Sequence, residues 1–235
     1  MYSSVQDRLE ISHCVRNDRW DLQISHFVRN DNISCGISVC NNEYMTGRTH
    51  DLAGFTALSL VVATVHQSPM TLGTAIVALS ANMIGSLTPD IDQSTADLWR
   101  RLPAGSIFGK MLAPILGGHR SISHSVIGIC LFALLSKALL NVMGTVVLVD
   151  MQVVWWAFMV GYVVHLLMDS LTHDGVPWLF PIPINFGFPP FKFMRFHTGK
   201  VVEKYVIFPG LILINIWIYY TFYDVFLTLL KSFVR

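Results

Sequence analysis

The chain has 235 residues, of which 53% are hydrophobic and 13% are charged. Soluble domains carry roughly 25% charged residues, so this composition excludes an ordinary soluble protein and indicates one integral membrane domain. The formal net charge of +1 gives no indication of a nucleic-acid partner.

The first 44 residues differ from the rest of the chain. The stretch ISHCVRND at 11–18 recurs as ISHFVRND at 24–31, a period of 13 residues. Because this segment is polar and has no sustained apolar run, it buries little surface, and we predict a disordered tail. It also lacks the apolar core of a signal peptide. The repeat is typical of translated repetitive DNA, and we hypothesise that the natural chain starts at Met45, which leaves 45–235 as the membrane-embedded domain.

Five apolar segments follow the tail and predict an all-α, polytopic membrane bundle of about four to five transmembrane helices. The segments are 52–65, 70–87, 125–149, 152–171 and 205–230. A spanning helix needs about 20 residues, and the last three segments reach that length. The first two are shorter and are joined by a tight turn, so we expect a helical hairpin.

The loops on one side of the predicted bundle carry nearly all of its basic residues. These residues are Arg48, Arg100, Arg101, Lys110, Arg120, Lys192, Arg195, Lys200 and Lys204. The positive-inside rule places this face in the cytoplasm. Because the histidine and aspartate motifs border the same loops, we predict that they meet at the cytoplasmic face of the membrane.

The motif HLLMDSLTH places His165, Asp169 and His173 at i, i+4 and i+8. In a continuous helix these positions share one face, within an arc of about 80°. Two ligands one turn apart on a rigid helix are a common way to hold a metal. The alternatives are a polar stripe that faces a pore and a buried His–Asp pair that is satisfied without a metal.

The motif TPDID closes the second segment. Pro89 is disfavoured inside a helix, so we expect Asp90 and Asp92 in an extended stretch, where alternate residues point the same way. Two neighbouring carboxylates repel unless a cation lies between them, and their oxygens suit divalent metals. The alternative is a solvated loop with an aspartate cap.

The motif GGHRSISHS opens the third segment. We expect Ser121 or Ser123 to cap the helix, with His119 in the loop and His124 in the first turn, so that both imidazoles reach one point. Arg120 is a candidate catalytic residue, because its planar fork binds phosphate oxygens. Its alternative role is that of a positive-inside anchor.

The predicted metal ligands are histidines and aspartates. They are His50, Asp90, Asp92, His119, His124, His165 and Asp169, with His173 and Glu203 as additional candidates. Asp92 is also a candidate catalytic residue. No CxxC pair occurs, so no thiolate zinc site is indicated. This ligand set suits zinc, manganese or iron, with zinc as our expectation. Because it exceeds the needs of one tetrahedral ion, we predict two divalent ions that share an aspartate.

Together these motifs resemble a known family. The elements HDL, PDID, GHRSISHS and GYVVHLLMDSLTHDGVPWLFP, between about residues 45 and 203, look like the YdjM-type family of bacterial inner-membrane metal-dependent hydrolases. The resemblance implies a helical fold grouped with the zinc-dependent phospholipase C-like superfamily, metals held by His and Asp from several helices, and phosphoester hydrolysis. The seven predicted ligands occupy motif positions, whereas His173 lies beside the matching Thr172.

We therefore expect a membrane-bound metal-dependent hydrolase. A metal-activated water would attack a phosphoester of a membrane lipid or a small molecule. The rivals are a metal or proton transporter, since ion pathways use intramembrane His and Asp, and a non-catalytic membrane protein with a structural metal. Crowding of the motifs at one face disfavours an ion path. The aromatic and basic stretch INFGFPPFKFMRF at 184–196 is expected at the headgroup layer.

Overall fold

The chain divides into two compact units, Met1–Glu43 and Tyr44–Arg235. The division lies beside the boundary that the sequence analysis set between residues 44 and 45. The computed structural model describes 13–16, 23–29, 32–38, 47–65, 70–92, 96, 99, 105–112, 122–182, 184–195 and 202–233.

Where the composition indicated a disordered tail, the N-terminal unit contains a three-stranded antiparallel sheet. Its strands are β1 (His13–Arg16), β2 (Gln23–Arg29) and β3 (Asn32–Ser38), in that order across the sheet. The two repeat copies supply β1 and β2 and pair so that His13 lies opposite His26. The expectation of disorder considered only burial, whereas the two copies pair through their backbones as neighbouring strands.

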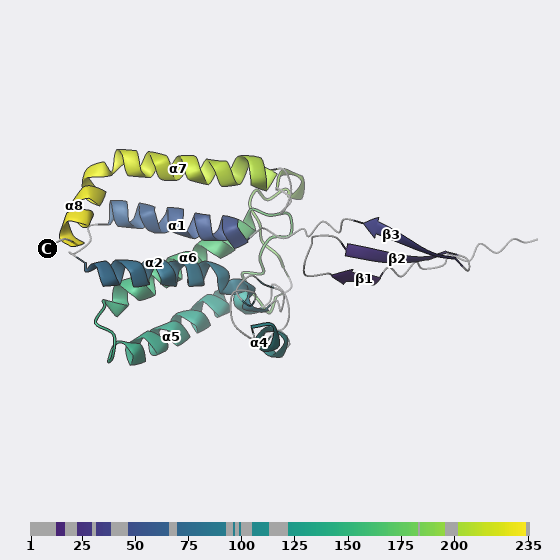
Figure 1. The fold of residues 1–235 in the computed structure, drawn as a ribbon, viewed down its shortest axis with the longest axis horizontal. Coiled ribbons are helices and arrows are strands. Elements are labelled where there is room, and N and C mark those ends of the chain that lie inside the picture. Colours follow the sequence, from purple (N-terminus) through teal and green to yellow (C-terminus); the bar gives the residue numbers. More distant parts are fainter. Residues whose placement is uncertain are drawn as a thin grey trace, which may run out of the picture. The chain divides into compact units, whose positions relative to one another are not determined.

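In the described part of the second unit, the named secondary-structure elements are all helices, as predicted, and an isolated bridge joins Val176 and Phe186. Its α-helices are α1 (Gly47–Thr64), α2 (Leu72–Leu87), α4 (Gly105–Leu112), α5 (Val126–Met143), α6 (Met151–Ser170), α7 (Phe208–Thr221) and α8 (Tyr223–Phe233). Short turns of other helix types are η1 (Pro89–Asp92), η2 (Ile122–His124), η3 (Lys192–Met194) and the π-helix η4 (Glu203–Ile207). The long helices α1, α2 and α7 run alongside one another, and α8 folds across one end (Figure 1).

Three of the described helices are long and apolar enough to cross a membrane: α5, α6 and the continuous stretch Glu203–Thr221. Helix α2 is apolar but shorter, and α1 has 18 residues of which the first turns carry the polar RTHD motif. The fifth predicted segment is not one helix, because the chain leaves helical geometry at Phe222 and α8 starts afresh. The third ends at Met143, earlier than predicted.

Helices α2 and α6 approach each other through glycine. A Cβ atom added at Gly85 would lie 2.1 Å from the Phe158 carbonyl oxygen, and one at Gly161 would lie 2.2 Å from the Asn82 carbonyl oxygen. The buried Asn82 side chain donates a hydrogen bond to the Ala157 carbonyl at 2.9 Å. Small residues and interhelical hydrogen bonds hold membrane helices together, so the last turns of α2 are fixed against the middle of α6.

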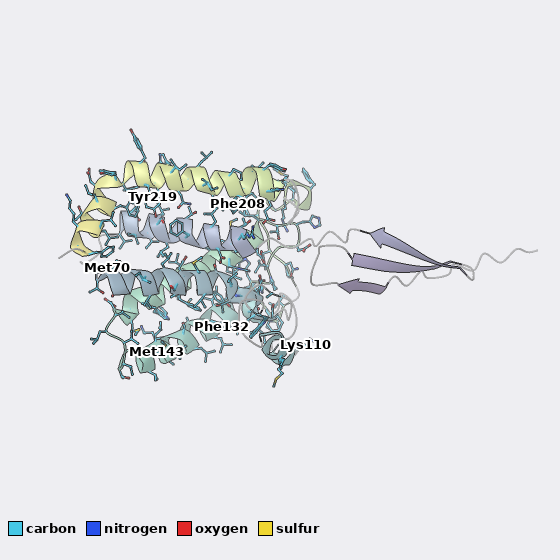
Figure 2. The ribbon with its side chains drawn as sticks, viewed as in Figure 1. Met70, Lys110, Phe132, Met143, Phe208 and Tyr219 are labelled. Carbon is cyan, nitrogen blue, oxygen red and sulfur yellow. The ribbon has the colours of Figure 1, made fainter. Side chains whose placement is uncertain are left out.

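The polar motifs gather at one end of the bundle. That end, marked by Phe208 and Lys110 in Figure 2, is where α1 and α5 begin and where α2 and α6 end. Met70 and Met143 mark the opposite end. The alternation of helix directions therefore brings residues far apart in sequence to one level.

Candidate metal centre

Five predicted ligands meet in a single buried cluster. His50 lies in the first turn of α1, Asp90 in η1 after α2, and His124 in η2 before α5. His165 and Asp169 lie one turn apart near the end of α6. Four separate parts of the chain therefore supply the cluster.

Two histidine nitrogens of the cluster each face the same two carboxylates. The Nε2 atom of His124 lies 3.6 Å from Asp90 Oδ1 and 3.5 Å from Asp169 Oδ2. The Nε2 atom of His165 lies 3.5 Å from Asp90 Oδ1 and 3.8 Å from Asp169 Oδ2. Zinc bonds of about 2.0–2.2 Å in a tetrahedron separate the ligand atoms by about 3.3–3.6 Å, whereas N–H···O hydrogen bonds are about 2.9 Å long. The spacing fits an ion better than direct hydrogen bonds.

The potential ligands form two groups of three residues, and His165 belongs to both. His50, His165 and Asp169 each offer one ligand atom within 4.8 Å of the others, as do Asp90, His124 and His165. Asp169 spans the two groups, because its Oδ1 lies 3.5 Å from His50 Nε2 while its Oδ2 faces His124 and His165. The His50 and His165 rings stack with their centroids 3.8 Å apart.

A backbone contact fixes the orientation of His165. Its Nδ1 atom lies 2.6 Å from the Ser86 carbonyl oxygen. Because a carbonyl only accepts, Nδ1 carries a proton, and in the neutral ring Nε2 keeps the lone pair that binds a metal. Within the described part of the chain, His165 Nε2 and His50 Nδ1 are buried without a hydrogen-bond partner. Buried imidazole nitrogens of this kind need a partner, and a metal ion is a suitable one.

Asp92 lies behind the His124 ring and not among the facing ligand atoms. Its Oδ2 accepts a hydrogen bond from Ser123 Oγ at 2.6 Å and lies 3.5 Å from His124 Nδ1. The opposite ring nitrogen, Nε2, faces Asp90 and Asp169. Asp92 belongs to neither group of potential ligands, and it lies where a carboxylate can fix the orientation of the His124 ring from outside the cluster. Asp90 and Asp92 diverge because they lie in a 3-10 turn, not in the extended stretch that was expected.

Tyr162 fixes the η2 turn through a hydrogen bond. The buried Tyr162 hydroxyl donates to the Ser123 carbonyl oxygen, and Ser123 Oγ lies 3.1 Å from His124 Nδ1. The α5 helix cap is Ser125, whose side chain accepts from the Gly128 backbone nitrogen, in place of the expected Ser121 or Ser123. His124 consequently precedes the helix instead of lying in its first turn.

His173 lies outside the cluster. Helix α6 ends at Ser170, so the i+8 position is not on the helix face. The His173 side chain is 42% exposed, and its Nδ1 lies 3.6 Å from Asp174. The chain turns away at Gly175, which has a φ of 69°.

Glu203 lies beside the cluster. The buried Thr49 hydroxyl donates to Glu203 Oε1 at 2.6 Å, directly before His50 in the chain. The π-helix η4 carries Glu203 at its first position, and isolated π turns often occur at functional sites.

The predicted ligand His119 and the predicted catalytic Arg120 lie outside the described residues.

The contacts of the cluster shift the pKa values of its residues outside the membrane-spanning helices. Burial alone would lower the pKa of His124, but Asp169, Asp90 and Asp92 outweigh burial and hold it well above its ordinary value. Burial alone would raise the pKa of Asp90, but His165 and His124 outweigh it and hold it well below. These carboxylates favour a proton on His124, and a cation that binds this ring would displace it.

Asp90 is the accessible member of the cluster. Its side chain is 25% exposed, against 0% for His124 and His165 and 4% for Asp169. Among these residues, a molecule that approaches from outside meets Asp90 first.

Sequence reasoning missed the residues that support the ligands, namely Thr49, Asn82, Ser86, Ser123 and Tyr162. A usable signal was the presence of Asn82 and Ser86 inside an otherwise apolar segment. The Ser86 contact to His165 uses a backbone carbonyl, which has no sequence signature.

Comparison with known proteins identifies relatives over the helical unit. Residues 45–231 match the family described as YdjM inner membrane protein. The uncharacterized protein YvsG of Bacillus subtilis (strain 168) is 24% identical over 179 residues, which cover 75% of this chain and 95% of the relative. Inner membrane protein YdjM of Escherichia coli (strain K12) is 32% identical over 121 residues, which cover 51% of this chain and 56% of the relative. The YdjM protein of Shigella flexneri gives the same values. No solved structure matches the chain.

Proposed function

This chain belongs to the YdjM inner membrane protein family, and we propose that it is a membrane-bound hydrolase that uses divalent metal ions, with zinc as the expected metal. The described helices include three that are long and apolar enough to span a membrane. Two of the relatives carry the name inner membrane protein. The proposed activity is that of the buried histidines and aspartates at the end of the bundle.

The proposal depends chiefly on the four atoms that face one another at 3.5–3.8 Å: the Nε2 atoms of His124 and His165 and one oxygen each of Asp90 and Asp169. Imidazole nitrogens and carboxylate oxygens are both zinc ligands, and two imidazoles with one carboxylate form one of the known catalytic zinc sites. Placing them at this spacing without an ion would leave His165 Nε2 buried and unsatisfied among the described residues. The fit of donor type, distance and burial supports a metal.

Two ions suit the full cluster better than one. The carboxylate of Asp169 directs one oxygen to His50 and the other to His124 and His165. A carboxylate so placed can bridge a pair of ions. The second ion would draw on His50, and the neighbouring residue Thr49 donates a hydrogen bond to Glu203.

When bound, ions of this kind polarise a phosphoryl oxygen and lower the pKa of a bound water to near neutrality. The residues of the chain would have separate roles in the reaction. Asp90, the most exposed of these side chains at 25%, would be the first that a substrate oxygen meets. Asp92 and Ser123 hold the His124 ring in place. Arg120, one of the predicted catalytic residues, would steady the negative charge of a phosphoester.

We place the centre on the cytoplasmic side of the inner membrane. The support is the bias of Lys and Arg toward the loops at the cluster end of the chain. The expected substrate is a phosphoester of a membrane lipid or of a small molecule that reaches this face.

Transport is a second candidate with one observation in its favour. Polar contacts between α1 and α7 continue beyond Thr49, since Asn215 donates to Thr56 at 2.6 Å and Ser59 lies 3.1 Å from the Tyr219 hydroxyl. These groups are hydrogen-bonded to one another. The described stretches 52–64, 72–87, 151–164 and 208–221 carry no acidic, basic or histidine residue, and Lys137 of α5 is exposed and contacts Gln152 and Trp155. An ion path through the bundle would need such groups, so hydrolysis is favoured.

The test is hydrolysis of a generic phosphodiester, bis(p-nitrophenyl) phosphate, by the full chain purified in detergent and loaded with zinc. We expect turnover that a chelator abolishes and that His165→Gln removes. The matched control is His173→Gln, which changes an exposed histidine close in sequence and outside the cluster, and it should keep wild-type turnover.

Zinc uptake into proteoliposomes is measured on the same samples. Turnover that is lost in His165→Gln and kept in His173→Gln supports the hydrolase. Zinc uptake without turnover would replace the hydrolase with the transporter. Zinc bound with neither activity would leave a structural metal site.

A further inference from the structure

The stretch 184–194, here named the aromatic loop, exposes large apolar side chains. The exposed fractions are 52% for Ile184, 42% for Phe186, 67% for Phe188, 61% for Phe191, 85% for Phe193 and 56% for Met194. In water such a concentration of apolar surface is costly and marks an interaction site. Something apolar therefore covers the loop.

The loop is built to keep these side chains pointing outward. Val176 and Phe186 exchange two backbone hydrogen bonds of 2.8 Å. The buried Arg195 side chain donates to the carbonyl oxygens of Pro189, Gly187 and Pro190 at 2.7, 2.9 and 3.2 Å. An arginine engaged in this way holds a defined loop shape, so the phenylalanines do not collapse onto the helices.

The base of the loop is fastened to two helix ends of the bundle. The Phe188 backbone nitrogen donates to Ser170, the last residue of α6, at 2.8 Å. The Trp178 carbonyl accepts from Val126, the first residue of α5, at 3.0 Å. Both α5 and α6 are long and apolar enough to span the membrane. The loop therefore lies where the spanning helices leave the hydrocarbon, at the level of His124 and Asp169.

We propose that the aromatic loop inserts into the headgroup layer of the leaflet on the side of the metal cluster. A lipid surface is favoured as its partner, because aromatic side chains at the ends of spanning helices are typical of the membrane interface. Tyr205, 64% exposed nearby in sequence, has the Lys204 ammonium 5.5 Å from its ring, a combination that suits anionic headgroups. Insertion fixes the depth of the cluster end in the bilayer and does not depend on hydrolysis.

The experiment measures the depth of one loop residue in liposomes. Phe193→Cys is introduced into the full chain with its native cysteines replaced by serine and labelled with the environment-sensitive fluorophore NBD. The matched control is Asp174→Cys, which labels an exposed polar position, 54% exposed, in the same connection between α6 and η4. Circular dichroism and zinc content equal to wild type verify that both labelled proteins are folded.

For NBD at position 193 we expect blue-shifted emission, quenching on the order of twofold by lipids that carry a shallow doxyl group, and protection from aqueous iodide. NBD at position 174 should show the reverse. Iodide quenching at 193 equal to that at 174 would overturn the proposal. Protection at 193 from both quenchers would also overturn it, because a protein partner or a second copy would then cover the loop. Neither result bears on phosphodiester turnover.

Discussion

Replacement of Gly161 by alanine tests how the bundle positions the metal cluster. The added Cβ would lie 2.2 Å from the Asn82 carbonyl oxygen and 2.9 Å from the Ser86 backbone nitrogen, where ordinary contacts begin at 3.4 Å. Because both neighbours are backbone atoms, α2 must retreat from α6 by about 1 Å. That movement stretches the 2.6 Å contact between Ser86 and His165 Nδ1.

The cost of this substitution has two parts. Overpacking costs about 1–3 kcal/mol, and loss of one buried hydrogen bond costs about 1 kcal/mol. The free energy of unfolding of Gly161→Ala should therefore fall by about 2–4 kcal/mol, measured by SDS-driven unfolding in mixed micelles with circular dichroism. Its zinc affinity should fall as well, since the His165 ring loses its fixed orientation.

The matched control is Gly210→Ala in α7, where an added Cβ meets nothing within 4 Å. Alanine is favoured over glycine in a helix by up to about 1 kcal/mol, so this variant should be as stable as wild type or slightly more stable. If Gly161→Ala matched the wild type in both stability and zinc affinity, the close contact of α2 and α6 would not be what positions His165.

Two further predictions concern the support and the protonation of His124. Ser123→Ala removes the hydrogen bond to Asp92, so zinc affinity should drop by about 10–100-fold in competition with a fluorescent chelator; an unchanged affinity would mean that Asp92 does not act through this contact. Zinc affinity should also fall as pH is lowered from about 8 to about 6, because the raised pKa of His124 keeps a proton on the ring that the ion must displace. An affinity that is independent of pH over this range would remove His124 from the ligand set.

The convergence of the motifs was predictable because it follows from helix direction. Once the apolar segments are taken as antiparallel helices, the start of α1, the end of α2, the start of α5 and the end of α6 must share one end of the bundle. The structure brings His50, Asp90, His124, His165 and Asp169 together at that end. The sequence pattern alone therefore predicted which end of the bundle these residues share.

The details that sequence did not predict depend on where helices stop. His173 continues the i, i+4 spacing of His165 and Asp169, but α6 ends at Ser170, where the Leu171 backbone nitrogen closes the last turn. Asp90 and Asp92 differ in position for a similar reason. They lie in a 3-10 turn that directs them to opposite edges of the His124 ring. A one-residue change in backbone geometry decides which carboxylate faces the cluster, and periodicity does not resolve such a change.

The central claim is that Asp169 joins the histidines of this chain into a metal centre. Elemental analysis of detergent-purified protein after zinc loading and desalting measures it directly. We predict about two zinc ions per wild-type chain and their loss in Asp169→Asn, which keeps the size of the side chain but removes its charge. A wild-type chain that retains no metal, or an Asp169→Asn chain that retains as much as wild type, would contradict the claim.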